Sequence, residues 1–511
     1  MTRERQLALA LGVGGALGVL AFVATLEPIA GLGVFAVAVG LYWLWNAPVR
    51  TVYLALMAAG LMVENPHERP WSGEWRTPWA ALGEVLYSSL QHTVPVPGLV
   101  LTGMETVLLA LVGLVLVRKA WALKLDPPPL PSPGVLRQAL LLSFATLLAL
   151  EAWGVARGGD LKHSLFQMRT LLFTPLVAYL GLYALRGPKD VLVLGRLLVA
   201  AAALRAVLGA YFFYAVARPA GILPPYVTTH TDTVLYVLAA VFLIARWWEA
   251  PSARRLGELA GAGAFVLLGL YLNDRRLAYV TLMGCLAALF LLSPWNRARR
   301  FVTRVALLSL PLLLGYVVVG WSSSAKVFKP VQAIRTVVAP AEGGGGSSAD
   351  SSTEFRFQEN FNLVQTWRAN PVLGAGFGHE YHEVIRLPDI SRFMPDYRYQ
   401  PHNGILWLLG IGGLLGFSAM FLFLGVTAFL AARAYHAAVR PAERAVMLVG
   451  LSSVIAYLNQ VYGDMGSQSY TSVWTLAPLV AVVGQVAMSS GGWKEAPRVA
   501  PRAEAGGEVT A

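Results

Sequence analysis

The stretch GILWLLGIGGLLGFSAMFLFLGVTAFLAA, residues 404–432, holds no charged residue from end to end. About 20 consecutive apolar residues are enough for a helix to cross a bilayer, so this run predicts a membrane-spanning helix. The rest of the chain has the same character, with 56% hydrophobic and only 13% charged residues among 511. Soluble domains carry about 25% charged residues, so this composition argues against an ordinary cytosolic enzyme.

Similar apolar runs recur along the whole chain and predict an all-α, polytopic integral membrane protein with about fourteen spans, in the range 12–14. The predicted spans are residues 7–26, 28–45, 50–63, 98–117, 135–155, 168–186, 190–216, 232–248, 257–272, 277–293, 301–320, 404–432, 444–462 and 470–488. One long polar segment, 321–403, interrupts them and is expected to carry amphipathic helices.

The basic residues are concentrated in every second connection between these runs, which gives the chain an orientation. Lys and Arg favour the cytoplasmic side of short loops, so both termini are predicted to be cytoplasmic and the 321–403 loop extracytoplasmic. The net charge of +12 is explained by this pattern, and we expect no nucleic-acid partner. The single cysteine, Cys285, excludes a disulfide framework and a thiolate metal site.

The long loop begins with a flexible glycine-serine linker at 343–348 and continues into a predicted helix. Ser351 and Glu354 fit a capping box at its start, and Asn370-Pro371 marks its end. Phe357, Phe361, Val364 and Trp367 recur at helical spacing, so we expect an amphipathic helix that lies on the membrane or on the bundle.

Two features follow that helix. Gly374-Ala375-Gly376-Phe377-Gly378 has no strand-helix context for a nucleotide site, so we interpret it as a tight turn. His402 then lies directly before the apolar run at the predicted outer mouth of a helix. Position alone leaves two alternatives open for His402, a helix-capping residue or a catalytic one.

The outer loop and its flanks resemble the O-antigen ligase and polymerase superfamily. The resemblance rests on an arginine before the long loop, a second arginine in the loop helix, a glycine-rich turn, and His-Asn before a glycine-rich span. In this chain these are Arg275-Arg276, Arg356, Asn370-Pro371-Val372-Leu373-Gly374-Ala375-Gly376-Phe377-Gly378, His402-Asn403-Gly404-Ile405-Leu406 and Gly410-Ile411-Gly412-Gly413-Leu414-Leu415-Gly416. The doubled arginine departs from the family pattern, so either Arg275 or Arg276 could be the substrate-binding residue, and Arg276 is the better aligned of the two.

The resemblance implies a metal-independent membrane glycosyltransferase without a cofactor, in the bacterial cytoplasmic membrane. Its donor would be a glycan linked to undecaprenyl pyrophosphate, and its acceptor a hydroxyl of a lipid-linked or other saccharide. Arg276 and Arg356 would clamp the pyrophosphate, because a guanidinium pairs with two phosphate oxygens and stays charged. His402 would be the general base of an inverting transfer. Ligase and polymerase activity both remain open.

Other charged residues leave further alternatives. Arg205 lies deep in a span, so it is either a substrate-binding residue or paired, with Glu105 and Glu151 as possible partners. His379 and His382 have the spacing of a metal pair, although a solvated turn explains them as well. Five further residues at predicted outer span ends could line a sugar groove: Arg169, His230, Asp232, Tyr399 and Asp464.

The matching stretch defines a division of the chain: N-terminal membrane helices at 1–272, a ligase-like core at 273–432, C-terminal membrane helices at 433–489 and a disordered cytoplasmic tail at 490–511. The competing interpretation is a non-enzymatic transporter or flippase of lipid-linked glycans. A transporter usually shows internal two-fold repetition, and this sequence shows none that is strong enough to claim.

Overall fold

The computed structural model describes residues 3–25, 28–66, 80–92, 100–121, 126–222, 224, 226–323, 325–338, 348–391, 396–463 and 469–495. Some predicted features lie outside these residues: most of the glycine-serine linker, Asp464 and the tail from 496 onward. The first residues of the predicted tail contact the bundle. The backbone amide of Gly134 donates to Glu495 Oε1 at 2.5 Å, and the Trp493 ring lies 6.4 Å from the Phe429 ring.

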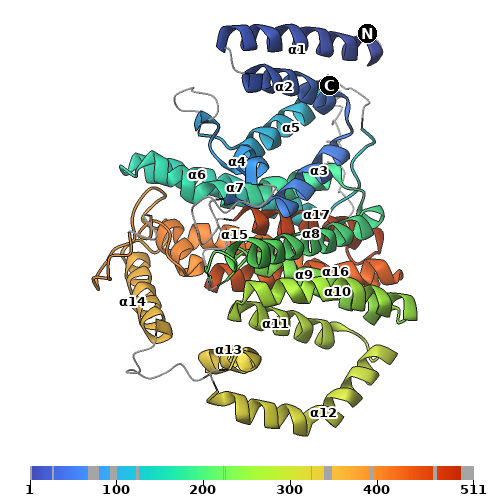
Figure 1. Ribbon diagram of the computed structural model, residues 1–511, viewed down its shortest axis with the longest axis vertical. Helices are drawn as coiled ribbons and strands as arrows, with labels where there is room; N and C mark the ends of the chain where they lie inside the picture. The colour runs from blue at the N-terminus through green and yellow to red at the C-terminus, as the bar shows by residue number, and fades with distance from the viewer. Residues whose placement is uncertain are drawn as a thin grey trace, which may run out of the picture.

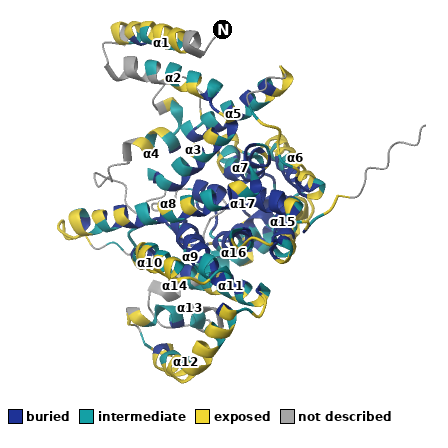
Figure 2. Cartoon of the chain, turned by 90° about the vertical axis from the view of Figure 1, so that its right-hand side faces the viewer, coloured by how far each residue is buried: buried dark blue, intermediate teal, exposed yellow. Residues whose placement is uncertain are grey.

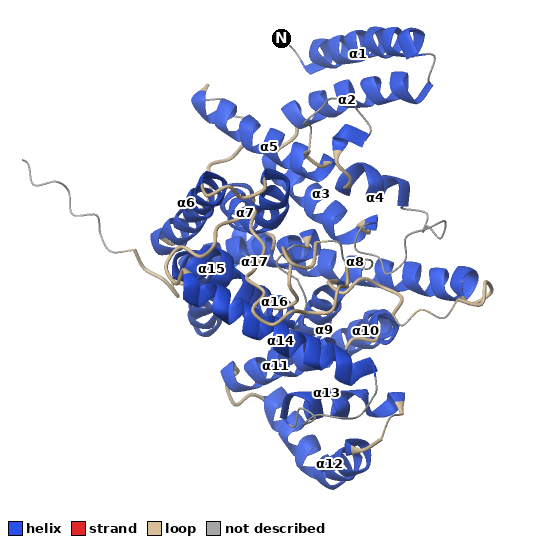
Figure 3. Ribbon diagram, turned by 90° about the vertical axis from the view of Figure 1, so that its left-hand side faces the viewer, coloured by secondary structure: helices blue, strands red, loops and turns tan. Residues whose placement is uncertain are grey.

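Every named element of the described chain is a helix (Figure 3). The α-helices are α1 Arg3–Thr25, α2 Pro28–Asn46, α3 Val49–Met62, α4 Ala80–Tyr87, α5 Gly103–Ala120, α6 Gly134–Ala156, α7 Leu161–Ala184, α8 Val191–Tyr211, α9 Asp232–Glu249, α10 Ala253–Asn273, α11 Arg276–Leu292, α12 Arg297–Trp321, α13 Lys329–Val338, α14 Ser348–Ala369, α15 Gly404–Ala437, α16 Pro441–Gly463 and α17 Tyr470–Ser489. Short helical segments are η2 Leu90–His92, η3 Gly187–Lys189, the π-helical η4 Phe212–Ala217 and η5 Lys326–Phe328.

Each predicted span coincides with one of these helices, and the all-helical membrane class is confirmed. Eight helices of the described chain are at least 18 residues long and apolar enough to cross a membrane: α6, α7, α8 with its π-helical extension, α10, α12, α15, α16 and α17. The figure of about fourteen spans stays a prediction, because eight helices among the described residues meet this criterion.

Helix α17 forms the centre of the bundle, although it is the last helix of the chain (Figures 1 and 2). Within its apolar window 94% of the residues are buried, against 0% for α12, which stands at the edge with α13. α17 packs against α3, α7, α9, α15 and α16, so helices from both ends of the sequence share one core.

Helix α15 is broken at Gly413, where φ is 60° and ψ is −166°. The break leaves backbone groups unpaired inside a membrane-spanning helix, and such groups need partners. The turn after α14 supplies them. The amides of Ala375 and Gly376 donate to the carbonyl oxygens of Gly410 and Ile411, both at 2.9 Å. The amides of Leu414 and Leu415 donate in return to Pro371 and Val372, at 2.8 and 3.1 Å.

The glycines of the 374–378 segment are required where this turn inserts beside the break in α15. Gly374 has a φ of +70°, and a Cβ atom there would lie 2.2 Å from the Ile411 carbonyl oxygen. On the other side of the turn, a Cβ on Gly376 would lie 2.5 Å from the Cα of Gly154 in α6. The predicted tight turn is therefore held between α6 and the break in α15.

Helix α14 ends at Ala369, as predicted from Asn370-Pro371, and it begins at Ser348, before the expected capping box. The side chain of Ser351 lies outside the described residues. Of the two alternatives for the aromatic stripe, packing on the bundle does not hold for Phe357 and Phe361, because their side chains are 77% and 40% exposed. The membrane alternative stays a prediction. The stripe that packs on the protein is instead Phe355, Glu359, Asn362, Leu363 and Thr366.

Candidate active site

His402 is held by a carboxylate from helix α14. Nδ1 of His402 lies 3.2 Å from Oε2 and 3.3 Å from Oε1 of Glu359, and the His402 backbone amide donates to the same carboxylate at 3.0 Å. Glu359 has no exposed surface. The Phe355 ring packs edge-on against the imidazole, with 5.9 Å between ring centroids. These contacts leave Nε2 as the ring nitrogen that can accept a proton.

His402 and Arg356 line the same groove. Its other lining residues come from α14 and from the loop that follows it: Glu354, Phe355, Gln358, Pro388 and Ile390. The groove contains about 1050 Å³ of space, part of it open to solvent. Nε of Arg356 is buried and has no hydrogen-bond partner within the described chain, so it remains a donor for a ligand.

The capping alternative for His402 is wrong, because its neighbour performs that role. Asn403 is the N-cap of α15, and its side-chain oxygen accepts from the Leu406 amide at 3.2 Å. The Asn403 amide group also donates to Asn360 Oδ1 at 3.1 Å, which fixes the start of α15 to α14. The side chain of His402 therefore does not cap α15, and it lines the groove.

Buried polar side chains fix the loop between α14 and His402. Gln167 of α7 accepts from the Gly378 amide at 2.7 Å and donates to the Tyr399 carbonyl oxygen at 2.8 Å. Asn362 of α14 bonds to the backbone of Val384 and Ile385. The loop is thus held from α7 on one side and from α14 on the other.

Tyr381 lies in the same region as a neutral phenol. Burial, together with the nearby carboxylates of Glu359 and Glu383, raises its pKa well above the usual value. The side chain is 3% exposed in total. Tyr381 therefore adds no charge beside the Glu359 carboxylate.

Arg275 and Arg276 lie at the junction of α10 and α11 and do not line the groove of His402 and Arg356. The Arg275 guanidinium stacks on Tyr226, with its central carbon 3.9 Å from the ring centroid. Arg276, the first residue of α11, is exposed. Asp274 between the helices has a φ of +51° and pairs with Lys329 of α13.

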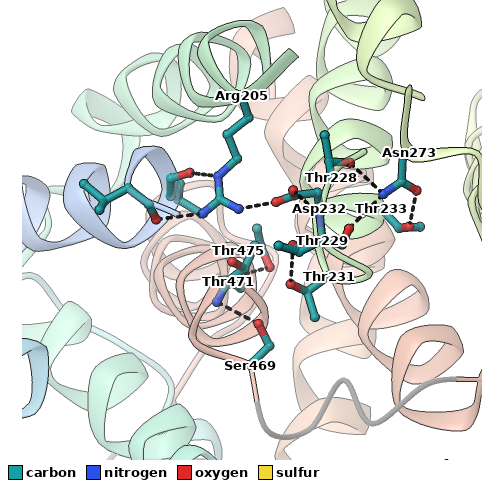
Figure 4. Close-up of polar contacts among 12 residues, drawn as sticks. Arg205, Thr228, Thr229, Thr231, Asp232, Thr233, Asn273, Ser469, Thr471 and Thr475 are labelled. Atoms are coloured by element: carbon teal, nitrogen blue, oxygen red, sulfur yellow. Dashed lines mark hydrogen bonds and ion pairs between the residues drawn. The ribbon is translucent and has the colours of Figure 1, made fainter. Parts of the chain in front are cut away.

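Arg205 is paired, and its partner differs from the two suggested by sequence. It forms an ion pair with Asp232, while Nε donates to the Leu61 carbonyl oxygen at 2.6 Å and Nη2 to that of Val63 at 3.0 Å (Figure 4). All three guanidinium nitrogens thus have protein partners. A substrate-binding role for Arg205 stays a prediction.

The remaining candidates also have partners. Glu105 contacts Arg169 at 3.4 Å and accepts from the Tyr470 hydroxyl, and Glu151 accepts from Ser164 at 2.6 Å. Tyr399 stacks on His163, with 3.8 Å between ring centroids. His230 packs edge-on against Tyr226.

The metal-pair alternative gains no support from the described chain, where no group of three or more His, Cys, Asp or Glu side chains could hold an ion. Nε2 of His379 lies 3.2 Å from the Gly154 carbonyl oxygen. The backbone amide of His382 donates to Thr366 Oγ1 at 2.8 Å. Both histidines thus contact the helices that hold the loop, α6 and α14.

Sequence reasoning missed Glu359, the residue that orients His402. The signal was present, because residues 355, 359, 362, 363 and 366 share one face of a helix. That face carries a carboxylate and an amide. The prediction was based instead on the aromatic stripe, which lies on the opposite face of the helix.

These features define a multi-span membrane protein with a histidine-carboxylate pair and an arginine in one groove beside a broken helix. Residues 261–421 match the family model described as O-antigen ligase. The resemblance to the O-antigen ligase and polymerase superfamily is thereby confirmed for this stretch of the chain. A search of curated proteins found no match. The family match supports glycosyl transfer of the O-antigen ligase type in general and does not favour the transporter alternative.

Proposed function

We propose that this protein transfers a glycan from an undecaprenyl-pyrophosphate-linked donor to an acceptor hydroxyl at the outer face of the bacterial cytoplasmic membrane. The observation that carries the proposal is the buried Glu359 carboxylate against Nδ1 of His402, in a groove that also holds Arg356. A carboxylate that fixes one imidazole nitrogen leaves the other ready to take a proton, which is the arrangement of a general base.

The proposed reaction is a single displacement at the anomeric carbon. The acceptor oxygen attacks the anomeric carbon of the donor sugar, and the bond from that carbon to the pyrophosphate oxygen breaks. His402 Nε2 takes the hydroxyl proton, Glu359 stabilises the resulting imidazolium, and undecaprenyl pyrophosphate leaves. Direct attack inverts the anomeric configuration.

The arginines would neutralise the leaving pyrophosphate. Nε of Arg356 faces the groove without a partner among the described residues. Arg276 is exposed at the start of α11, outside the residues that line the groove, and its place in the clamp follows from the family resemblance. Charge that develops on a leaving group is stabilised most by donors already in place. A guanidinium fork supplies such donors without a metal ion.

The proposal is tested with purified protein, a lipid-linked donor and a saccharide acceptor. Arg276→Lys and Arg356→Lys keep the charge but lose the fork, so we expect severe loss of transfer with normal membrane insertion. Arg254→Lys, on a side chain that is 90% exposed, is the matched control. Near-full activity of both test variants would exclude the arginine clamp.

Glycan analysis of a deletion strain separates the two activities of the superfamily. Loss of all polymer from the acceptor lipid, with normal chain length on the carrier, would identify a ligase. Products with a single repeating unit would identify a polymerase. Unchanged polymer on the acceptor and unchanged chain length would contradict both.

A further inference from the structure

The segment before α9 is fixed by charges that have no access to solvent. Asp232, the first residue of α9, pairs with Arg205 of α8 through Oδ1, and its Oδ2 accepts from the Thr229 amide at 3.0 Å (Figure 4). Both side chains of the ion pair are at most 2% exposed. An unpaired charge in this position would be very costly, so the pair holds the segment in one conformation.

Asn273, the last residue of α10, joins the same segment. Its Nδ2 donates to Thr228 Oγ1 at 3.0 Å and to the Thr229 carbonyl oxygen at 2.8 Å, and its Oδ1 accepts from Thr233 Oγ1 at 2.8 Å (Figure 4). Asn273 is completely buried. The end of α10 and the segment 228–233 therefore form one rigid polar unit, and Asn273 precedes the arginine pair by only two residues.

Tyr226 lies at the start of this unit and supports Arg275. The central carbon of the Arg275 guanidinium lies 3.9 Å from the centroid of the Tyr226 ring, and His230 packs edge-on against the same ring with 4.7 Å between ring centroids. The Val227 amide donates to the Leu272 carbonyl oxygen at 3.0 Å, which ties the segment to α10 beside the arginine. The tyrosine is thus a fixed platform for a cation.

The two neighbouring arginines have different surroundings. Nε and Nη2 of Arg275 are buried beneath the surface, whereas Arg276 is exposed. Within the described chain, no hydrogen bond or ion pair is found for the Arg276 side chain. Arg275 is placed to hold the start of α11, and Arg276 is placed to meet a ligand from outside.

We infer that Tyr226 is a positioning residue for the arginine pair: it anchors Arg275, and that anchor sets the position from which Arg276 binds the donor pyrophosphate. The inference rests on the proposed function for the identity of the anion. It assigns Arg276 as the binding residue and Arg275 as its structural support.

The test measures binding of farnesyl pyrophosphate, a soluble polyprenyl pyrophosphate, to monodisperse full-length protein. We expect Tyr226→Leu to weaken binding about five- to thirty-fold, the range of a cation–π contact, and Tyr226→Phe to restore it. Arg276→Gln should weaken binding on the order of a hundredfold. Tyr214→Leu is the matched control on a tyrosine that is 51% exposed, and it should bind like the wild type.

Arg275→Gln serves as the second variant in case Tyr226→Leu does not fold. It should weaken binding by the same modest factor as Tyr226→Leu. The double variant should lose little more affinity, because both substitutions remove the same contact between Tyr226 and Arg275. If Arg276→Gln abolishes binding while Tyr226→Leu and Arg275→Gln bind normally, the positioning role of Tyr226 is wrong. The pyrophosphate-binding role of Arg276 would still hold. If Arg275→Gln is as severe as Arg276→Gln, Arg275 is itself a ligand and the assignment fails. Wild-type protein that does not bind the probe would contradict the clamp and this inference together.

Discussion

At the scale of single residues, the carboxylate of Glu359 faces Nδ1 of His402, with both oxygens within 3.3 Å of that nitrogen. A carboxylate can only accept from Nδ1–H, so the proton stays on Nδ1 and the lone pair stays on Nε2. The tautomer that a general base needs is therefore set by a residue that never touches substrate.

The first prediction concerns this pair. Glu359→Gln keeps the shape of the side chain, but its amide group can donate to Nδ1 and favour the wrong tautomer. We expect transfer to fall by about 10²- to 10⁴-fold with donor binding unchanged. Glu380→Gln, an outer-loop carboxylate that is 45% exposed, is the control and should remain active. A fully active Glu359→Gln protein would show that Glu359 does not orient the base.

The second prediction concerns the buried ion pair of Arg205 and Asp232. Asp232→Ala leaves a buried guanidinium with one partner fewer, and breaking such a pair costs about 3–5 kcal/mol. Thermal unfolding in detergent should show a large loss of stability. The control is Arg254→Ala, which removes an exposed partner of Glu258 and should cost about 1 kcal/mol or less. Equal shifts for the two variants would contradict a structural role for the buried pair.

At the scale of elements, helix α15 shows what the sequence could and could not predict. Its apolar run predicted the helix, and the observed Gly404–Ala437 contains the whole predicted span. The break at Gly413 was hidden, because glycine within an apolar run is equally compatible with a continuous helix. Only the turn at 371–376, which pairs with the broken backbone, reveals why the two glycine-rich motifs occur together.

Other elements show the same division between what was predictable and what was not. Spans were predictable because burial in lipid demands long apolar runs. Amphipathic helices were expected within 321–403, but the position of helix α13, Lys329–Val338, was not predicted, because it is short and depends on packing against α11 and α12. His402 was found from its place before a span, and Glu359 was missed because its function depends on a contact with a residue 43 positions away.

The third prediction tests the insertion of the turn into α15. Gly413→Ala places a Cβ atom 2.2 Å from the Val372 carbonyl oxygen at a residue with a φ of +60°. We expect a loss of roughly 2 kcal/mol or more in stability, together with reduced transfer, because the turn also positions the loop before His402. Gly425→Ala, on the same helix with nothing within 4 Å of its Cβ, should be neutral or slightly stabilising. Equal behaviour of the two variants would contradict the insertion.

At the scale of the whole molecule, charged side chains join helices at both ends of the bundle. At the predicted cytoplasmic end, Arg50 pairs with Asp190 at 2.5 Å, and Arg444 pairs with Glu249 at 3.0 Å. At the opposite end, the unit of Arg205, Asp232 and Asn273 joins α8, α9 and α10. The basic residues that suggested an orientation thus also fix neighbouring helices to one another.

The fourth prediction tests that orientation. Cys285 is completely buried, and Cys285→Ser gives a background without cysteine. In that background Val384→Cys, in the long loop and 53% exposed, should react with an impermeant maleimide added to intact cells. Val439→Cys, between α15 and α16 and 90% exposed, should react only after the membrane is opened. The reverse pattern would invert the predicted topology.

The most direct measurement of the central claim compares transfer and donor binding for His402→Ala and His402→Asn. Asn403 already caps α15, so neither change removes the cap, and protein yield should stay normal. We expect both variants to bind donor like the wild type and to lose transfer by about 10²- to 10⁴-fold. A His402→Asn protein with near-wild-type transfer would contradict the assignment of His402 as the general base.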